Sequence, residues 1–289
     1  MTGALFVDKP AGPTSHDVVA RVRRLLDIRA VGHAGTLDPF ATGLLVVLVG
    51  RATRLARFVE QQPKRYLATA RLGMATTTDD LTGEPAGGGF APSGPPSRAE
   101  VERELRAMLG RQLQRPPAYS AKLVDGVRSY RLARRGEAVE LAPVEVEIHD
   151  VELLDYAAPD VTLRVTVSPG TYVRAIARDL GERLGCGAHL TSLRREAIGG
   201  ITLDDAVPLE AVTGDVLRPP LDAVAHLPPL RVDAAQARAI GFGQRPEVGA
   251  ASLEGRGPVT AVDLSGQLVA VGHVSAGHFE PQVVLEAAG

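Results

Sequence analysis

The chain has 289 residues, of which 45% are hydrophobic and 23% charged, a balance typical of globular proteins and unlike that of disordered or fibrous chains. Its single cysteine, Cys186, excludes an intramolecular disulfide and a cysteine-based zinc site, and fits a protein of the reducing cytoplasm. The first residues lack the pattern of a signal peptide, and the longest apolar run, 44–49, is too short to span a bilayer.

The formal net charge of −2 conceals a segregated charge distribution. Residues 51–75 carry +5 and residues 111–136 carry +6, so the rest of the chain carries −13. Two basic stretches on an otherwise acidic protein are typical either of a nucleic-acid-binding face or of ordinary solvated helix faces. Charge alone leaves both interpretations open.

Hydrophobic spacing and turn residues predict the elements of the first two thirds of the chain. In chain order we expect a strand over 4–7, a helix capped by Thr14 or Ser15, a strand over 44–49 that is buried on both faces, a helix over 54–61 and a strand over 66–72. The next predicted helix begins with a capping box at Ser97–Glu100 and runs to Leu109. It is followed by a hairpin turn at Asp125–Gly126, strands over 144–154 and 161–167, and a helix over 171–184.

The character of the sequence changes after residue 226. A Leu-Pro-Pro segment at 227–229 is followed by a short predicted helix over 234–240 and by two strands, 259–262 and 268–271, that can pair across a turn. We therefore predict a large domain over residues 1–226 and a small, mostly β domain over 227–289.

The most specialised segment is the string Gly-His-Ala-Gly-Thr-Leu-Asp-Pro-Phe-Ala-Thr-Gly at residues 32–43. Glycines permit positive φ and close approach to a ligand, and Pro39 biases Asp38 away from helical backbone angles. We therefore expect the Asp38 carboxylate to be presented from a fixed loop, where functional groups concentrate. The plainer alternative is that Asp-Pro only forms a turn.

This string resembles the G-H-x-G-T-L-D-P-x-A-x-G signature of the TruB family of tRNA pseudouridine synthases. Further segments are similar to family elements in the same order: K-P-x-G-x-T-S at 9–15, K-x-Y at 64–66, P-P-x-Y-S-A at 116–121, and G-T-Y-[VI]-R followed by D-L-G at 170–181. The resemblance implies an α+β fold with a mixed, largely antiparallel central sheet, an inserted RNA-gripping region and a small C-terminal PUA-like domain.

The resemblance also implies roles for individual residues. Asp38 would be the catalytic residue, Arg174 would pair with it, and Tyr66 would lie against the target base. Leu193 would line the pocket, and His33 would fill the gap that a flipped nucleotide leaves. Each has a plainer interpretation: a surface helix charge for Arg174, ordinary core for Tyr66 and Leu193, and a loop histidine for His33.

Three more residues complete the predicted substrate-binding set. Lys9 and Tyr172 lie within matched motifs, and Lys64 begins the K-x-Y element. Lysines in such a set would contact phosphates and would position the RNA without reading its sequence.

Pseudouridylation breaks the bond between ribose C1′ and uracil N1, rotates the base and joins C1′ to C5. Because this isomerisation involves no redox change and no phosphate energy, we expect no cofactor and no metal. Asp38 could attack C1′, add to C6 or remove the C2′ proton, and the sequence leaves all three open.

The resemblance implies that the substrate is the uridine at position 55 in the T-loop of tRNA. We expect the protein to be a monomer and not to associate with a membrane. Two rival functions remain at this stage. One is a non-catalytic tRNA-folding chaperone of the same fold, and the other is a pyrimidine methyltransferase that uses Cys186 as its nucleophile.

Overall fold

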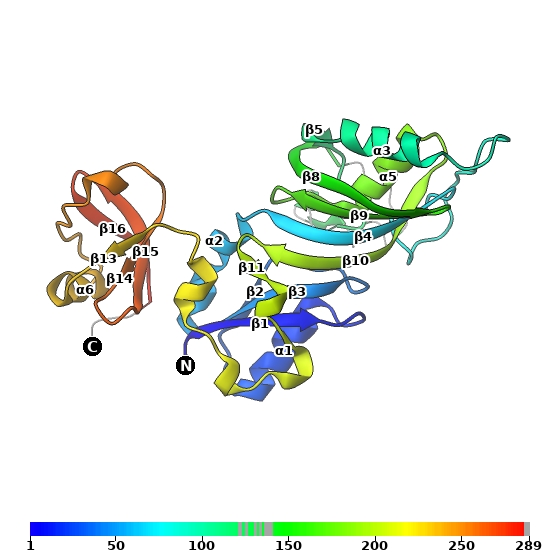
Figure 1. Cartoon of the computed structure of the whole chain (residues 1–289). Coiled ribbons are helices and arrows are strands. Elements are labelled where there is room, and N and C mark those ends of the chain that lie inside the picture. The colour runs from blue at the N-terminus through cyan, green and yellow to red at the C-terminus, as the bar shows by residue number, and fades with distance from the viewer. Residues whose placement is uncertain (121–122, 125–126, 130–131, 133–134, 136–140, 286–289) are drawn as a thin grey trace. The chain divides into compact units, whose positions relative to one another are not determined.

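The computed structural model describes residues 1–120, 123–124, 127–129, 132, 135 and 141–285 (Figure 1). The predicted turn at Asp125–Gly126 lies outside the described residues. The chain divides into two compact units, one formed by Met1–Gln61 with Gly199–Gly289 and the other by Gln62–Ile198. The domain boundary predicted at 226/227 falls within the first of these units and stays a prediction.

The first unit begins with strands and helices in the order β1 (Gly3–Lys9), α1 (Ser15–Leu26), β2 (Val31–Ala34), β3 (Thr42–Val49), the 3₁₀ turn η1 (Gly50–Leu55) and α2 (Ala56–Glu60). After residue 198 it continues with β11 (Ile201–Thr202) and β12 (Val207–Pro208), accompanied by the short 3₁₀ turns η2 (Leu203–Asp205), η3 (Leu209–Ala211), η4 (Gly214–Val216) and η5 (Pro220–Val224).

Strand β3 is the core of this part of the unit. Its residues from Leu44 to Val49 are fully buried, as the continuous apolar run predicts. β3 pairs antiparallel with β1 and with β2, and β1 pairs parallel with β12. The pairing is therefore mixed, and it places the end of β2 and the start of β3 on either side of the Asp38 loop.

The remainder of the first unit is a small four-stranded sheet in the order β13 (Pro229–Arg231), β14 (Val259–Val262), β15 (Leu268–Ser275) and β16 (His278–Val284). Helix α6 (Ala234–Gly241) and the 3₁₀ turn η6 (Ala251–Leu253) belong to the same segment. The predicted antiparallel pairing of 259–262 with 268–271 is confirmed. Ile240 and Phe279 are fully buried in the core of this sheet.

The second unit is built on an antiparallel sheet with the strand order β10 (Ala188–Ile198), β4 (Lys64–Leu72), β9 (Asp160–Val167), β8 (Val144–Ala157) and β5 (Gly110–Gln114). The short strands β6 (Leu123–Val124) and β7 (Val127–Arg128) pair with each other. Helix α5 (Val173–Arg183) packs against β10 and β4, and α3 (Arg98–Ala107) packs against β8 (Figure 1).

These observations confirm the predicted α+β class with a mixed, largely antiparallel sheet. The structure differs from the expectation at element ends and in strands that the sequence did not predict, among them β2, β5 and β10. The helix expected over 171–184 begins at Val173 because Tyr172 has extended backbone angles, and the segment 54–61 divides between η1 and α2. In the part of the chain that the structure describes, no helix is long and apolar enough to cross a membrane.

Two predicted helix starts are confirmed in detail. Thr14 caps α1, and its hydroxyl accepts a hydrogen bond from the backbone N–H of Asp17 at 3.1 Å. Ser97 caps α3 in a capping box, in which the Glu100 carboxylate accepts from the Ser97 backbone N–H at 2.7 Å. The Asp17 carboxylate accepts in turn from the Thr14 backbone N–H at 2.9 Å, so both helices begin with a capping box that satisfies donors without a partner inside the helix.

We expect Ser97→Ala to lower the free energy of unfolding by about 1 kcal/mol, because it removes the side-chain acceptor at the start of α3. Urea unfolding followed by circular dichroism measures the change. Ser252→Ala, at an exposed serine, is the control and should leave the midpoint unchanged. Equal effects of the two substitutions would contradict the cap assignment.

Candidate active site

The loop that carries Asp38 is anchored through the backbone on both sides of the aspartate. On one side, the buried Ser15 hydroxyl accepts from the N–H of Leu37 at 2.9 Å and donates to the Leu37 carbonyl at 3.2 Å. On the other side, the Pro39 carbonyl accepts from the Gly12 N–H at 2.8 Å and from Lys9 Nζ at 3.3 Å. The two neighbours of Asp38 are therefore held by a helix start and by the end of β1.

The backbone geometry of the loop explains its glycines. Gly35 and Gly43 have φ values of 91° and 100°, in the region that favours glycine. The Ala41 N–H donates to the Asp38 carbonyl at 3.1 Å, so Asp38 also begins a turn, as the Asp-Pro pair predicts. The loop does not span the whole motif at residues 32–43, because the first residues of the motif belong to strand β2 at 31–34. Asp38 itself is half-buried.

His33 lies on β2, where the register pairs it with Val47 of β3. Its ring packs edge-on against the ring of His16, with 5.2 Å between centroids and an angle of 85° between ring planes. This contact orients the His33 ring from α1. The predicted role of His33 in filling the gap of a flipped nucleotide stays a prediction.

In the second unit, Tyr66 and Leu193 share one face of the sheet. Tyr66 on β4 is 7% exposed and pairs with Arg195 of β10, while Leu193 is 6% exposed and pairs with Ala68. Residues two apart on a strand point to the same face, so Tyr66 and Leu193 are diagonal neighbours there. Arg195, fully buried opposite Tyr66, is a cation that sequence reasoning missed.

Arg174 lies in the first turn of α5 and is almost completely buried. Its Nη1 donates to Asp80 Oδ2 at 3.2 Å and to the Thr78 carbonyl at 3.0 Å, and its Nη2 donates to the Tyr119 carbonyl at 2.9 Å. A buried guanidinium is tolerated only when it is paired and hydrogen-bonded. The expected pairing of Arg174 with Asp38 stays a prediction.

Asp80 is the main functional candidate that sequence reasoning missed. Its Oδ1 accepts from the Thr78 hydroxyl at 2.7 Å, and from the backbone N–H and hydroxyl of Thr82 at 2.9 and 2.5 Å. These bonds leave Oδ2 facing Arg174. The available signal was the threonine- and aspartate-rich run 76–82 directly after a strand, because such residues fold into side-chain-stabilised turns.

Tyr172 caps α5 and is held by a buried glutamine. The Tyr172 N–H donates to Gln114 Oε1 at 2.9 Å, and Gln114 Nε2 donates to the Tyr172 carbonyl at 3.2 Å. Gln114, only 1% exposed, thus connects the end of β5 to the start of the helix that carries Arg174. Sequence reasoning also missed this residue.

The two predicted RNA-contacting lysines are buried rather than surface cations. Lys9 is fully buried, and its Nζ donates to the carbonyls of Pro10 and Pro13, both at 2.8 Å, as well as to Pro39. Lys64 is 8% exposed, and its Nζ donates to the Gln62 carbonyl at 2.8 Å. These bonds give Lys9 a part in holding the Asp38 loop, whereas its predicted substrate contact stays a prediction.

The position of Cys186 disfavours its use as a nucleophile. The residue is 3% exposed, and its carbonyl accepts from the Gly89 N–H at 2.9 Å. A buried thiol in a structural position is unreactive unless a substrate reaches it.

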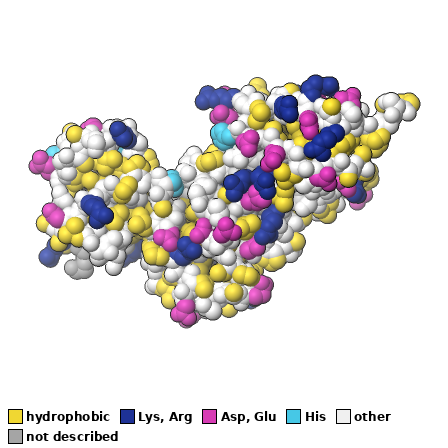
Figure 2. All heavy atoms as spheres, in the orientation of Figure 1, with side chains coloured by type: hydrophobic (Ala, Val, Ile, Leu, Met, Phe, Trp, Pro, Cys, Tyr) yellow, Lys and Arg dark blue, Asp and Glu magenta, His cyan; other side chains and the backbone are white. Residues whose placement is uncertain are grey.

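Many arginines of the second unit are paired with acids on its surface. Arg71 pairs with Asp160 at 2.8 Å and Arg65 with Glu196 at 3.4 Å. In Figure 2, the Lys and Arg side chains are interspersed with Asp and Glu. The basic stretches of the sequence therefore include solvated ion pairs as well as cations that could contact phosphate.

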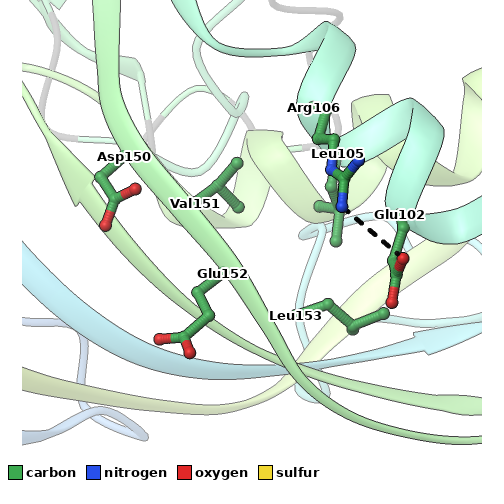
Figure 3. A pocket seen from close by; sticks show the side chains of 7 residues that line it. All are labelled: Glu102, Leu105, Arg106, Asp150, Val151, Glu152 and Leu153. Carbon is green, nitrogen blue, oxygen red and sulfur yellow. Dashed lines mark ion pairs between the residues drawn. The ribbon is translucent and has the colours of Figure 1, made fainter.

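A cavity of about 370 Å³ lies between α3 and β8, lined by residues 102, 105, 106 and 150–153 (Figure 3). Three of these residues are acidic, and the single cation, Arg106, pairs with Glu102 at 3.9 Å. No predicted site residue lines this cavity, and its acidic lining is unsuited to RNA phosphate. Within the described ranges, no three His, Cys, Asp or Glu side chains lie close enough together to hold a metal ion.

Comparison with known families gives two adjacent matches. The model of the TruB family pseudouridylate synthase N-terminal domain matches residues 23–173, and that of the tRNA pseudouridylate synthase B C-terminal domain matches residues 174–223. The tRNA pseudouridine synthase B of Thermobifida fusca is 46% identical over 292 residues, which cover 98% of each chain. The Solibacter usitatus protein of the same name is 42% identical over 295 residues, 99% of this chain and 100% of its own.

Solved structures show the same fold at lower identity. An H/ACA RNP bound to a substrate RNA containing 2′-deoxyuridine includes a chain that matches with a TM-score of 0.77 and 23% identity, over 99% of this chain and 86% of that one. An archaeal box H/ACA Nop10–Cbf5 complex gives a TM-score of 0.76 and 24% identity over the same shares. At such identities the likeness establishes the fold alone.

We expect Asp80→Asn to lower the free energy of unfolding by about 3 kcal/mol, because it leaves the buried Arg174 guanidinium without its carboxylate. Catalytic turnover should fall by about tenfold or more as Arg174 loses its orientation. Urea unfolding and single-turnover assays measure the two effects.

Asp160→Asn is the matched control, since it removes the carboxylate from an exposed Asp–Arg pair. It should lower stability by less than about 1 kcal/mol. A loss of similar size in both variants would contradict the importance assigned to the buried pair.

Proposed function

Because the chain belongs to the TruB family of tRNA pseudouridine synthases, we propose that its target is the uridine at position 55 in the T-loop of tRNA. The chain is an isomerase that converts uridine to pseudouridine in tRNA. A tRNA-folding role without catalysis and a methyltransferase role for Cys186 are not favoured by these relatives.

The observation that best supports Asp38 as the catalytic residue is the double anchoring of its loop. Ser15 holds Leu37, and Gly12 with Lys9 holds Pro39, so the carboxylate projects from a backbone that has little freedom. Catalysis benefits when a reacting group is held in position before the substrate arrives. Asp38 would act on the ribose or the base while the bond from C1′ to N1 breaks.

The second unit supplies groups suited to the remaining steps. Tyr66 and Leu193 share a buried face, where a ring can stack on the extruded uracil and an apolar side chain can line its pocket. The Tyr66 hydroxyl would assist the transfer of the proton that leaves C5 after the new carbon–carbon bond forms. Arg174 would hold the Asp38 carboxylate in its ionised form.

The proposal needs one copy of the chain, a tRNA and no cofactor. The atoms of uridine are conserved in the product, since the proton lost from C5 is balanced by the proton gained at N1. We propose that the enzyme acts as a monomer in the cytoplasm and without a metal ion.

Asp38→Asn should reduce pseudouridine formation by about 10³-fold or more, while the affinity for tRNA changes little. Tritium release from tRNA labelled at uridine C5 measures the first, and filter binding measures the second. Asp215→Asn, at an exposed aspartate, is the control. Turnover that survives Asp38→Asn would remove Asp38 from the mechanism.

A tRNA in which cytidine replaces the uridine at position 55 tests the proposed target. We expect tritium release to fall to background, because the label that leaves C5 comes from that one nucleotide. Continued release from the altered tRNA would show that another uridine is the substrate.

A further inference from the structure

Helix α5 carries a second arginine, Arg178, one turn after Arg174. Its Nη1 donates to Asp79 Oδ2 at 3.0 Å, and its Nη2 donates to the Arg115 carbonyl at 2.8 Å. Arg174 makes the equivalent pair of contacts, to the Thr78 carbonyl and the Tyr119 carbonyl. The two arginines therefore fasten the same two segments, 78–80 and 115–119, to one helix.

The charge of Arg178 is already balanced by its neighbours. Besides Asp79, its guanidinium binds Asp179 at 2.7 Å and lies 3.9 Å from Glu182, and its side chain is 18% exposed. Burial raises the pKa of the Asp79 carboxyl, and the Arg178 charge opposes that rise. A guanidinium held by three carboxylates is unsuited to binding phosphate, so its contribution here is geometric.

Arg115 has the opposite character. Its side chain is exposed, and among the described residues its guanidinium forms no ion pair with a carboxylate. By contrast, Arg111 on the neighbouring strand lies 3.6 Å from Glu147. Arg115 therefore presents a cation that can bind a phosphate without first losing a carboxylate partner from the described part of the chain.

The backbone of Arg115 is fixed from three directions. Its carbonyl is held by Arg178, the preceding Gln114 exchanges two hydrogen bonds with Tyr172, and the following Pro116 and Pro117 are buried with restricted φ. A charged side chain on a fixed backbone loses less conformational freedom when it binds than one on a mobile loop.

We propose that Arg115 contacts a backbone phosphate of the tRNA and that Arg178 is the positioning residue that holds Arg115 for this contact. The inference rests on tRNA as the substrate of the proposed function. Helix α5 would then align this RNA contact with Arg174, because Arg174 and Arg178 both hold the segment that begins at Arg115.

The test measures the affinity for an unmodified tRNA transcript at 50 and 200 mM KCl. One lost phosphate contact removes about 0.7–0.9 from the slope of log affinity against log salt. Across this fourfold change in salt, the wild-type affinity should therefore fall about threefold more than that of Arg115→Ala.

Arg178→Lys should show the same reduced salt dependence although it keeps its charge, because an ammonium group cannot span Asp79, Asp179 and the Arg115 carbonyl together. The double variant should show no further reduction. Arg103→Ala removes an exposed arginine that pairs with Glu104, and it should keep the wild-type slope.

Wild-type salt dependence in Arg115→Ala would overturn the phosphate contact. Wild-type salt dependence in Arg178→Lys, with a reduced slope in Arg115→Ala, would overturn the positioning role. If Arg178→Lys does not fold, Asp79→Asn takes its place with the same expected reduction, because it removes one of the groups that orient Arg178. Pseudouridine yield from the wild-type samples is measured in parallel. No product from the wild type would contradict the proposed function, whereas normal product with unchanged salt dependence in the variants would contradict only this inference.

Discussion

The burial of the Arg174 guanidinium is the constraint on which the second unit depends. A cation whose side chain is 5% exposed requires hydrogen-bond acceptors, and this chain provides Asp80 and two backbone carbonyls for its two terminal nitrogens. Those acceptors come from the segment after β4 and the segment after β5. Satisfying one buried charge thus fixes two loops to helix α5, and Arg178 repeats the arrangement one turn later.

The Asp38 loop is also held in place by hydrogen bonds, in this case to its backbone groups rather than around a buried guanidinium. Leu37 is bonded to the Ser15 hydroxyl, and the Pro39 carbonyl accepts from the Gly12 N–H and from the Lys9 ammonium group. Such bonds hold the peptide units on either side of Asp38. A reactive carboxylate on a rigid backbone is suited to a reaction in which a flipped base has to meet it in one orientation.

Local patterns in the sequence were sufficient for much of the fold. The apolar run 44–49 forms a fully buried strand, and the cap at Thr14 and the capping box at Ser97 begin helices as expected. Element ends were less predictable. Residues 31–34 form a strand because they pair with the edge of β3, and their own composition does not predict this pairing.

The sequence by itself determined the family, the reaction class and the Asp38 loop, because turn chemistry and ordered motifs are written in neighbouring residues. Tertiary structure alone decided that Asp80 meets Arg174, 94 residues away, and that Gln114 holds Tyr172. It also decided that Lys9 and Lys64 are buried, although their charge suggested surface contacts. The physical reason is that the partner of a buried charge depends on sheet register and helix packing, which bring together segments that no short-range pattern connects.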